Sequence, residues 1–276
     1  MASPAETHDA MANVVWAQRA RLFGQSQGDR WEGLAFRFRD DPDRRPERIL
    51  RAIARNLRPA DVLLDIGGGA GRYGLPLARR CRETIVVDPS AAMQVEFNAA
   101  VAAAKIDNAR FVHRDWLEAG DIEGSVSLVS HVTYFVTDIA RFLDKLIAAT
   151  SRRVMIVVAA VPPPNRGADL YAVLHGEEQA LAPSYRELLP VLWQAGGLPE
   201  VRVIAPEREP TRRFRTRDEA IEAVLPREAG ASGGPREKAR DAIERDFDRL
   251  FLRTPRGFER ATRTDERLLL LSWDTR

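Results

Sequence analysis

The sequence predicts an α/β fold with a buried parallel sheet, on the basis of three short segments. Residues 62–66 (VLLDI) are an apolar run with an acid near its end, and a cluster of glycines follows. Residues 84–87 (TIVV) are rich in β-branched residues and precede Asp88, and residues 109–113 predict a third strand. Runs of this kind are typical of parallel strands buried on both faces, which bind ligands at their carboxyl ends.

Four glycines stand within the five residues from Gly67 to Gly71. Glycine loses more backbone entropy on folding than any other residue, so this cluster is costly unless the backbone must turn tightly and approach a ligand. We therefore predict a cofactor-binding loop. Simple packing of a strand against a helix is the alternative.

Two classes of cofactor bind at loops of this kind. The dinucleotide pattern G-x-G-x-x-G matches at Gly69, Gly71 and Gly74. A pyrophosphate at this loop would face Asp65, and two unit charges ~4 Å apart repel by about 4 kcal/mol at an effective dielectric of ~20. S-adenosylmethionine has no phosphate, and its ammonium and sulfonium groups are attracted by a carboxylate. The charge argument favours S-adenosylmethionine over NAD or NADP.

Further acids follow the second and third predicted strands. Asp88 stands where a carboxylate can accept hydrogen bonds from both hydroxyl groups of a ribose. Dinucleotide enzymes use an acid at this position too. After the third strand, Asp115 can accept from an adenine amino group while Trp116 lies against the ring face.

Taken together, these residues resemble the class I S-adenosylmethionine-dependent methyltransferases, in particular the small-molecule enzymes with type 11, 12 or 25 domains and a D-x-G-G-G-x-G loop. The resemblance extends from Asp61 to Leu146 and includes DIGGGAG, the D-x-S-x-x-M element that begins at Asp88, and the fourth-strand segment 127–146. It implies a doubly wound, Rossmann-like, seven-stranded sheet with an antiparallel last strand. It also implies methyl transfer as the activity.

The resemblance implies a set of cofactor-binding residues, which are Asp65, Gly67, Gly68, Gly69, Gly71, Asp88, Pro89, Met93, Asp115 and Trp116. Some of them also fit a purely structural role. Asp88 suits a helix N-terminus, Trp116 suits a core position, and Met93 lies on a helix whose apolar residues pack inward in either case.

His131 is the candidate catalytic residue, since it ends the fourth strand, where enzymes of this family meet their substrates. It can take a proton from the acceptor or orient it. The alternative is a backbone contact to the cofactor with an idle side chain.

The chain divides into four predicted segments. Residues 1–45 form an N-terminal helical arm or lid, and residues 46–210 form the S-adenosylmethionine-binding, Rossmann-like core. Residues 211–266 form a helical insertion, with helical patterns at 217–225 and 236–252, and residues 267–276 carry the last strand. The insertion departs from the plain family core, and we interpret it as a substrate-side lid or a dimer contact.

The composition of the chain limits the classes of binding partner and the cellular compartment that we expect. The formal net charge of 276 residues is only +2, so no nucleic-acid partner is implied. The lone Cys81 suits a reducing cytoplasm, no apolar stretch approaches ~20 residues, and no metal site is predicted. The fourth strand is followed by SHVTY and not by the N-P-P-Y or D-P-P-Y of amino-methylating nucleic-acid enzymes. A monomer or homodimer acting on a small molecule is expected.

These observations favour a methyltransferase that moves a methyl group from S-adenosylmethionine to a small-molecule acceptor by in-line displacement. Two alternatives stay open. One is a catalytically idle fold that binds S-adenosylmethionine or a partner, and the other is a nicotinamide-dependent oxidoreductase.

Overall fold

The computed structural model describes residues 2–24, 28–207, 213–225, 234–262 and 264–275. The chain forms two compact units, which are considered separately. The sheet unit comprises residues 1–162, 182–207 and 267–276, and the insert unit comprises residues 163–181 and 208–266. The boundaries predicted from the sequence differ from this grouping in that residues 163–181 cluster with the insertion.

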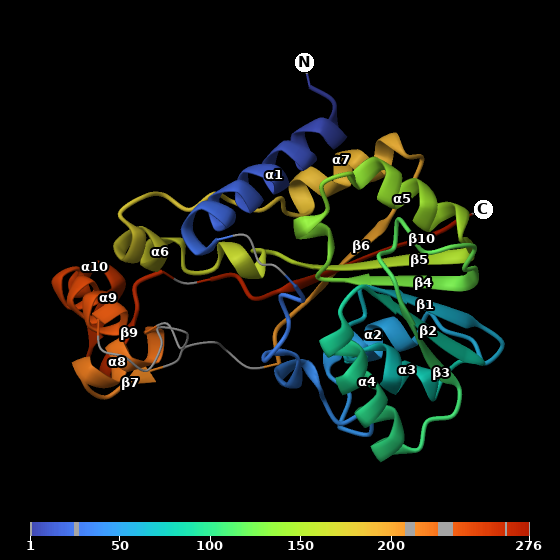
Figure 1. Ribbon diagram of the computed structural model, residues 1–276, viewed down its shortest axis with the longest axis horizontal. Coiled ribbons are helices and arrows are strands. Elements are labelled where there is room, and N and C mark those ends of the chain that lie inside the picture. Colours follow the sequence, from blue (N-terminus) through green and yellow to red (C-terminus); the bar gives the residue numbers. More distant parts are fainter. Residues whose placement is uncertain (1, 25–27, 208–212, 226–233, 263, 276) are drawn as a thin grey trace. The chain divides into compact units, whose positions relative to one another are not determined.

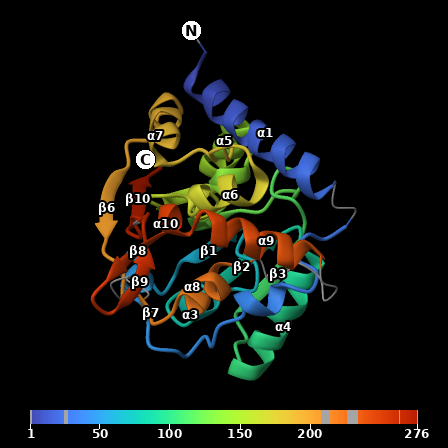
Figure 2. The same ribbon diagram turned by 90° about the vertical axis from the view of Figure 1, so that its left-hand side faces the viewer.

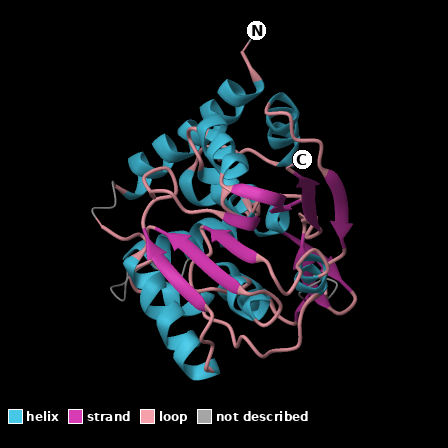
Figure 3. Cartoon of the chain, turned by 90° about the vertical axis from the view of Figure 1, so that its right-hand side faces the viewer, coloured by secondary structure: helices cyan, strands magenta, loops and turns pink. Residues whose placement is uncertain are grey.

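The sheet unit contains a seven-stranded sheet with the order β3-β2-β1-β4-β5-β10-β6 (Figures 1 and 3). The first five strands in this order pair in parallel, whereas β10 is antiparallel to both β5 and β6. This confirms the predicted Rossmann-like sheet with its antiparallel last strand. The strands are β1 (Val62–Ile66), β2 (Glu83–Asp88), β3 (Ala109–His113), β4 (Gly124–Ser130), β5 (Thr150–Ala159), β6 (Glu200–Ile204) and β10 (Leu268–Asp274).

Helices cover both faces of this sheet, as expected for a doubly wound fold. In Figure 1, α1, α5 and α7 lie on one face and α2, α3 and α4 lie on the other. The helices are α1 (Pro4–Phe23), α2 (Arg48–Ala54), α3 (Gly74–Ala78), α4 (Ala91–Ala104), α5 (Ile139–Ala148) and α7 (Tyr185–Gln194), with 3-10 turns η1 (Ala35–Phe38) and η2 (Thr133–Phe135).

Local sequence explains where these helices begin. Ser3 and Glu6 form a reciprocal capping box at the start of α1, and Ser90 caps α4 by accepting from the Met93 amide. Helix α5 presents Ile139, Phe142, Leu143 and Leu146 to the core, which is the spacing of one helical face. Within the described part of the chain, no helix combines the length and apolar composition needed to span a membrane.

The insert unit contains helices and a small sheet (Figure 2). Aromatic and aliphatic side chains form its core. Its elements are η3 (Pro163–Asn165), α6 (Ala168–His175), α8 (Arg217–Val224), α9 (Gly234–Arg245), α10 (Phe247–Leu250), β7 (Arg213–Phe214), β8 (Phe251–Thr254) and β9 (Gly257–Arg260). Rings of Phe247, Phe251 and Phe258 pack together in its core, with centroids 4.7–5.2 Å apart.

The predicted helices of the insertion are present, but its three-stranded sheet, ordered β7-β9-β8, was missed. The second helical pattern was expected to continue to Leu252, whereas Phe251 and Leu252 already belong to β8. Gly257 begins β9 with φ +115°, and a Cβ there would lie 2.0 Å from the Phe214 carbonyl oxygen. The backbones of β7 and β9 therefore approach closely at a residue without a side chain. Strands this short give too weak a sequence signal to be predicted.

Candidate functional site

The glycine loop follows β1 at the carboxyl end of the sheet. Gly67, Gly69 and Gly71 have φ values of +68°, +54° and +80°, which an L side chain rarely adopts. A Cβ at Gly67 would lie 2.4 Å from Val132 Cγ2, in the segment after β4. The Gly67 amide donates to the Val87 carbonyl at 2.7 Å. The loop is thus held close to the ends of both neighbouring strands.

Asp88 is the best-defined polar group beside this loop. Its Oδ2 accepts from the Gly69 amide at 3.0 Å, and its Oδ1 accepts from the Ser90 amide at 2.9 Å. A carboxylate has about four acceptor positions, so each oxygen keeps the capacity for one further donor. Burial raises the pKa of Asp88, and the two amide bonds offset part of that rise. This arrangement fits a ligand that offers two hydroxyl groups.

Asp65 lies beneath the loop. Its side chain is 1% exposed, and within the described residues neither carboxylate oxygen has a hydrogen-bond partner of ordinary geometry. Cβ atoms added at Gly68 or Gly74 would stand 2.6 Å from this carboxylate, so the loop closes over it. Burial raises the pKa of Asp65 to about 7, and the nearby Gly74 amide offsets only part of the rise. A group that is only partly ionised at neutral pH weakens the charge argument made from the sequence.

His131 comes directly after β4 and has φ +59°, an uncommon conformation for a residue with a side chain. Its amide donates to the Val157 carbonyl at 3.0 Å, and its Nδ1 lies 3.1 Å from the Tyr134 hydroxyl. The Tyr134 oxygen also accepts from the Ala159 amide at 2.6 Å. The imidazole is therefore oriented by a buried tyrosine that is fixed to the end of β5.

The other predicted residues lie in different surroundings. Asp115 is exposed, and its Oδ1 accepts from the Leu117 amide at 2.8 Å. Trp116 is 4% exposed, and its Nε1 donates to the Phe142 carbonyl at 3.4 Å. The Lys145 ammonium stands 4.7 Å from the Trp116 ring centroid. Little of this ring is open, so contact between its face and adenine stays a prediction that the packing does not favour.

Met93 and Pro89 flank the acid at the end of β2. Met93 is buried with Ala35 and Ala70, and a Cβ at Gly69 would meet its sulfur at 3.4 Å. Met93 thus supports the loop from below. The Pro89 carbonyl lies 2.8 Å from His113 Nε2, which ties the ends of β2 and β3 together.

A short segment, residues 29–31, lies against the start of α4, and we call it the strap. Asp29 accepts from the Ser90 hydroxyl at 2.7 Å, the Ala92 amide at 2.8 Å and the Trp31 amide at 3.0 Å. Burial raises the pKa of Asp29, but these bonds outweigh burial and the pKa falls below its usual value. Ser90 lies 61 residues further along the chain, so no local sequence signal indicates this contact.

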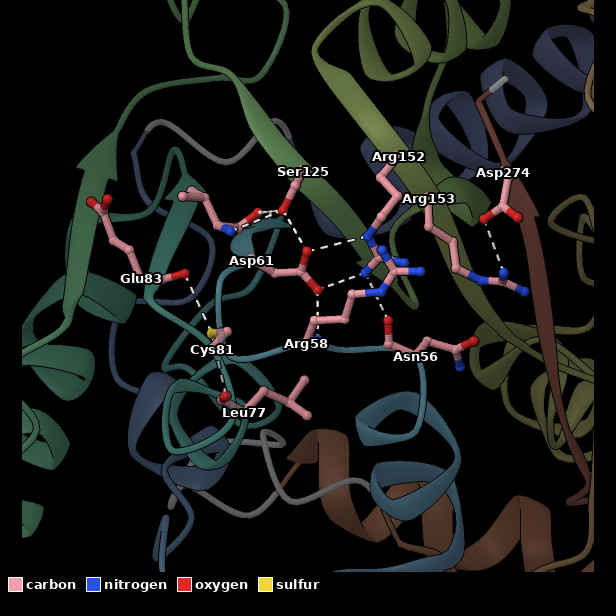
Figure 4. Close-up of polar contacts among 11 residues, drawn as sticks. Asn56, Arg58, Asp61, Leu77, Cys81, Glu83, Ser125, Arg152, Arg153 and Asp274 are labelled. Carbon is pink, nitrogen blue, oxygen red and sulfur yellow. Dashed lines mark hydrogen bonds and ion pairs between the residues drawn. The ribbon is translucent and has the colours of Figure 1, made fainter.

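A second polar cluster lies at the opposite end of β1 (Figure 4). Asp61 accepts from Arg152 Nη2 at 2.6 Å, from the Ser125 hydroxyl at 2.9 Å and from the Arg58 amide at 2.6 Å. Burial raises the pKa of Asp61, but these partners outweigh burial and hold it below its usual value. Every Asp61 oxygen is occupied, so this cluster fastens β1, β4 and β5 together and leaves no acceptor for a ligand.

Comparison with known proteins agrees with this geometry. Residues 63–152 match the family described as a methyltransferase domain. A putative methyltransferase from Bacillus halodurans has a similar structure, with a TM-score of 0.55 and 13% identity over 82% of this chain and 97% of that one. The YcgJ protein from Bacillus subtilis gives a TM-score of 0.53 and 15% identity over 82% and 97%. No curated protein sequence matches the chain.

A geranyl diphosphate methyltransferase in complex with S-adenosylmethionine is also similar, with a TM-score of 0.50 and 16% identity over 83% of this chain and 84% of that one. These likenesses concern the fold. Residues 63–152 are thus similar to a methyltransferase domain, and the fold of the chain is similar to that of solved methyltransferase structures.

Proposed function

We propose that the protein is an S-adenosylmethionine-dependent methyltransferase that acts on a small-molecule acceptor. The observation that carries the proposal is Asp88, which is held by the Gly69 and Ser90 amides at the end of β2 with both oxygens able to accept one more hydrogen bond. This carboxylate stands beside a loop with three positive-φ glycines, inside the matched methyltransferase domain.

The residues present fit the cofactor in a definite order along the sheet. Asp88, at the end of β2, accepts hydrogen bonds from the ribose hydroxyl groups. Asp115, which follows β3, accepts from the adenine amino group. The glycines after β1 allow the backbone to approach the remaining part of the molecule, since no side chain stands in the way. Asp65 and Met93 support the loop from beneath.

When bound, the cofactor would supply a methyl group on a sulfonium, with the thioether S-adenosylhomocysteine as the leaving group, so methyl transfer would need only one in-line displacement. The chain has to hold the acceptor in line and, where the acceptor carries a proton at neutral pH, remove that proton. His131 is the candidate for the second task. Its Nδ1 lies 3.1 Å from the Tyr134 hydroxyl, and this contact orients the ring.

A small acceptor is favoured because the segment after β4 is SHVTY and carries no N-P-P-Y or D-P-P-Y motif. The net charge of +2 supports the same choice, since phosphate-rich partners favour a strongly basic surface.

Calorimetric titration with S-adenosylhomocysteine, beside NAD and NADP, tests the cofactor. We expect micromolar affinity for S-adenosylhomocysteine alone. Binding of a dinucleotide would favour an oxidoreductase, and no binding of any of the three would favour an idle fold. Turnover is then tested by release of S-adenosylhomocysteine from S-adenosylmethionine in the presence of phenols, amines and carboxylic acids.

The proposed role of His131 is tested with His131→Ala and His131→Gln once an acceptor is found. We expect slower turnover and unchanged affinity for S-adenosylhomocysteine. Tyr134→Phe is the matched control for ring orientation. Unchanged turnover in His131→Ala would remove this residue from the mechanism.

A further inference from the structure

Arg30, in the strap, is surrounded by aromatic rings. Its guanidinium carbon lies 4.6 Å from the ring centroid of Trp31, 5.0 Å from that of Phe135 and 5.2 Å from that of Trp16. The Trp16 and Phe135 rings are themselves 5.7 Å apart, and Trp16 Nε1 donates to the Phe135 carbonyl at 3.1 Å. Three elements distant in sequence therefore build one aromatic enclosure for this guanidinium.

The enclosure leaves the hydrogen-bonding capacity of Arg30 unused. Within the described residues no acid forms an ion pair with it and no acceptor takes its N–H groups. Asp29 and Asp88 act on Arg30 only through their charges. Burial lowers the pKa of Arg30, but a guanidinium keeps its proton in proteins. Aromatic faces stabilise such a cation without satisfying its five donors.

The contacts of the strap, taken together with the order of the strands, indicate that Arg30 lies over the glycine loop. Asp29 is anchored to Ser90 and Ala92, which follow β2, while Arg30 reaches Phe135, which follows β4. In the sheet, β1 lies between β2 and β4, so the strap crosses the end of β1. The packing of Trp31 and Ala35 with Ala70, inside the glycine loop, agrees with this path.

We propose that Arg30 binds the carboxylate of a ligand held at the glycine loop. The inference rests on the proposed function, because it takes the loop as the cofactor site. A planar guanidinium pairs with a carboxylate through two parallel N–H···O bonds, which would satisfy the donors that the rings leave free.

The direction of the bound cofactor favours one source of this carboxylate. Adenine at β3 and ribose at β2 leave the methionyl part to extend past β1 toward β4, where Arg30 meets Phe135. A carboxylate on the methyl acceptor would offer the same chemistry from the other side. The test therefore has to separate these two sources.

The experiment compares wild type with Arg30→Met, Arg30→Lys and Arg19→Met by calorimetry. Arg19→Met is the matched control, because Arg19 is an exposed arginine that acts on Arg30 only through its charge. The probes are S-adenosylhomocysteine and 5′-methylthioadenosine, which lacks the amino acid part. Benzoate is then titrated into protein saturated with S-adenosylhomocysteine. Thermal unfolding checks that each variant folds.

We expect Arg30→Met to weaken S-adenosylhomocysteine binding by about 10- to 100-fold, as for lost hydrogen bonds to a charged group, and to leave 5′-methylthioadenosine unaffected. Arg30→Lys should lose less, since it keeps the charge without the planar fork, and it carries the test if Arg30→Met does not fold. Unchanged S-adenosylhomocysteine binding with Arg30-dependent binding of benzoate would assign the carboxylate to the acceptor.

Equal weakening of both nucleosides, or no weakening together with no Arg30-dependent benzoate binding, would overturn the proposal and leave Arg30 as a tether of the strap. Failure of wild type to bind S-adenosylhomocysteine is a separate result, which would refute the proposed function itself and this inference with it.

Discussion

Two buried aspartates stand at opposite ends of β1, and they differ in their hydrogen-bond partners and in the direction of their pKa shifts. Asp61, before the strand, has Arg152, Ser125 and the Arg58 amide as partners, and its pKa is lowered. Asp65, near the end of the strand, has no hydrogen-bond partner of ordinary geometry among the described residues, and its pKa is raised to about 7. The same residue type therefore fastens the sheet at one end and leaves an uncompensated group beneath the proposed site at the other.

This difference is typical of a protein in which stability and ligand binding occupy separate ends of one sheet. A buried polar group without a partner costs free energy, and such groups cluster at functional sites. Four measurements test whether the two ends of β1 differ in this way.

The largest expected effect is that of pH on Asp65→Asn. The folded pKa of about 7 lies above the ordinary 3.8, so the folded state binds the Asp65 proton more tightly than the unfolded state does. The wild type therefore loses stability as the pH rises from 3.8 to about 7. Relative to wild type, the variant should gain on the order of 4 kcal/mol in unfolding free energy between pH 4 and pH 8. Urea unfolding at both pH values measures this gain. A difference that does not change with pH would contradict the isolation of this carboxylate.

Asp61→Asn should behave in the opposite way. At pH 7 the variant leaves the Arg152 guanidinium without its carboxylate, and we expect a loss of about 3 kcal/mol. The loss should shrink as pH falls below 3.8, because wild-type Asp61 then takes up a proton through its lowered pKa. Asp274→Asn is the control, since its bond to Arg153 is exposed and exposed pairs contribute about 0–1 kcal/mol. Equal losses in the two variants would refute the special role of Asp61.

Gly67→Ala tests the glycine loop. Its Cβ would collide with Val132, and an L side chain is strained at the φ of +68°, so we expect a loss of about 2–3 kcal/mol in unfolding free energy. Gly24→Ala is the control, because Gly24 also has a positive φ but has no atom within 4 Å of an added Cβ. Chemical denaturation of both variants gives the comparison, and a loss no larger than that of Gly24→Ala would mean that Val132 moves aside without cost.

Asp88→Ala should weaken S-adenosylhomocysteine binding by on the order of 1–3 kcal/mol, because the ribose hydroxyls lose their acceptors. Calorimetry measures the change, with Asp107→Ala as an exposed control. Equal affinity in wild type and Asp88→Ala would move the ribose site elsewhere. Gly69→Val would be less informative, since its side chain would point toward Met93.

The strands and the glycine loop were predictable because their signals are local. Runs such as VLLDI and TIVV are apolar and β-branched over whole strands, and a glycine cluster this dense is too costly in backbone entropy to serve packing alone. The orientation of single side chains was not predictable in this way. Trp116 suits a ligand face or a core in the sequence, and the packing against Phe142 and Lys145 favours the core.

The contacts of Asp29 and Arg30 and the small sheet of the insert unit were not predicted, for a related reason. Asp29 and Arg30 acquire their surroundings from residues 61 and 105 positions away, Ser90 and Phe135, and no periodicity links them. Strands β7 to β9 have two to four residues each, so their pairing depends on tertiary packing more than on local propensity.

The order of residues was enough to specify the class of this protein: a doubly wound sheet, a glycine loop after its first strand, and an acid after its second. It was enough because backbone freedom and buried strands impose residue types at neighbouring positions. The folded chain was needed to establish which acids have partners, that Met93 supports the loop, and that Arg30 stands among three rings. These properties depend on burial and on long-range contacts, which arise when distant segments meet across the end of the sheet.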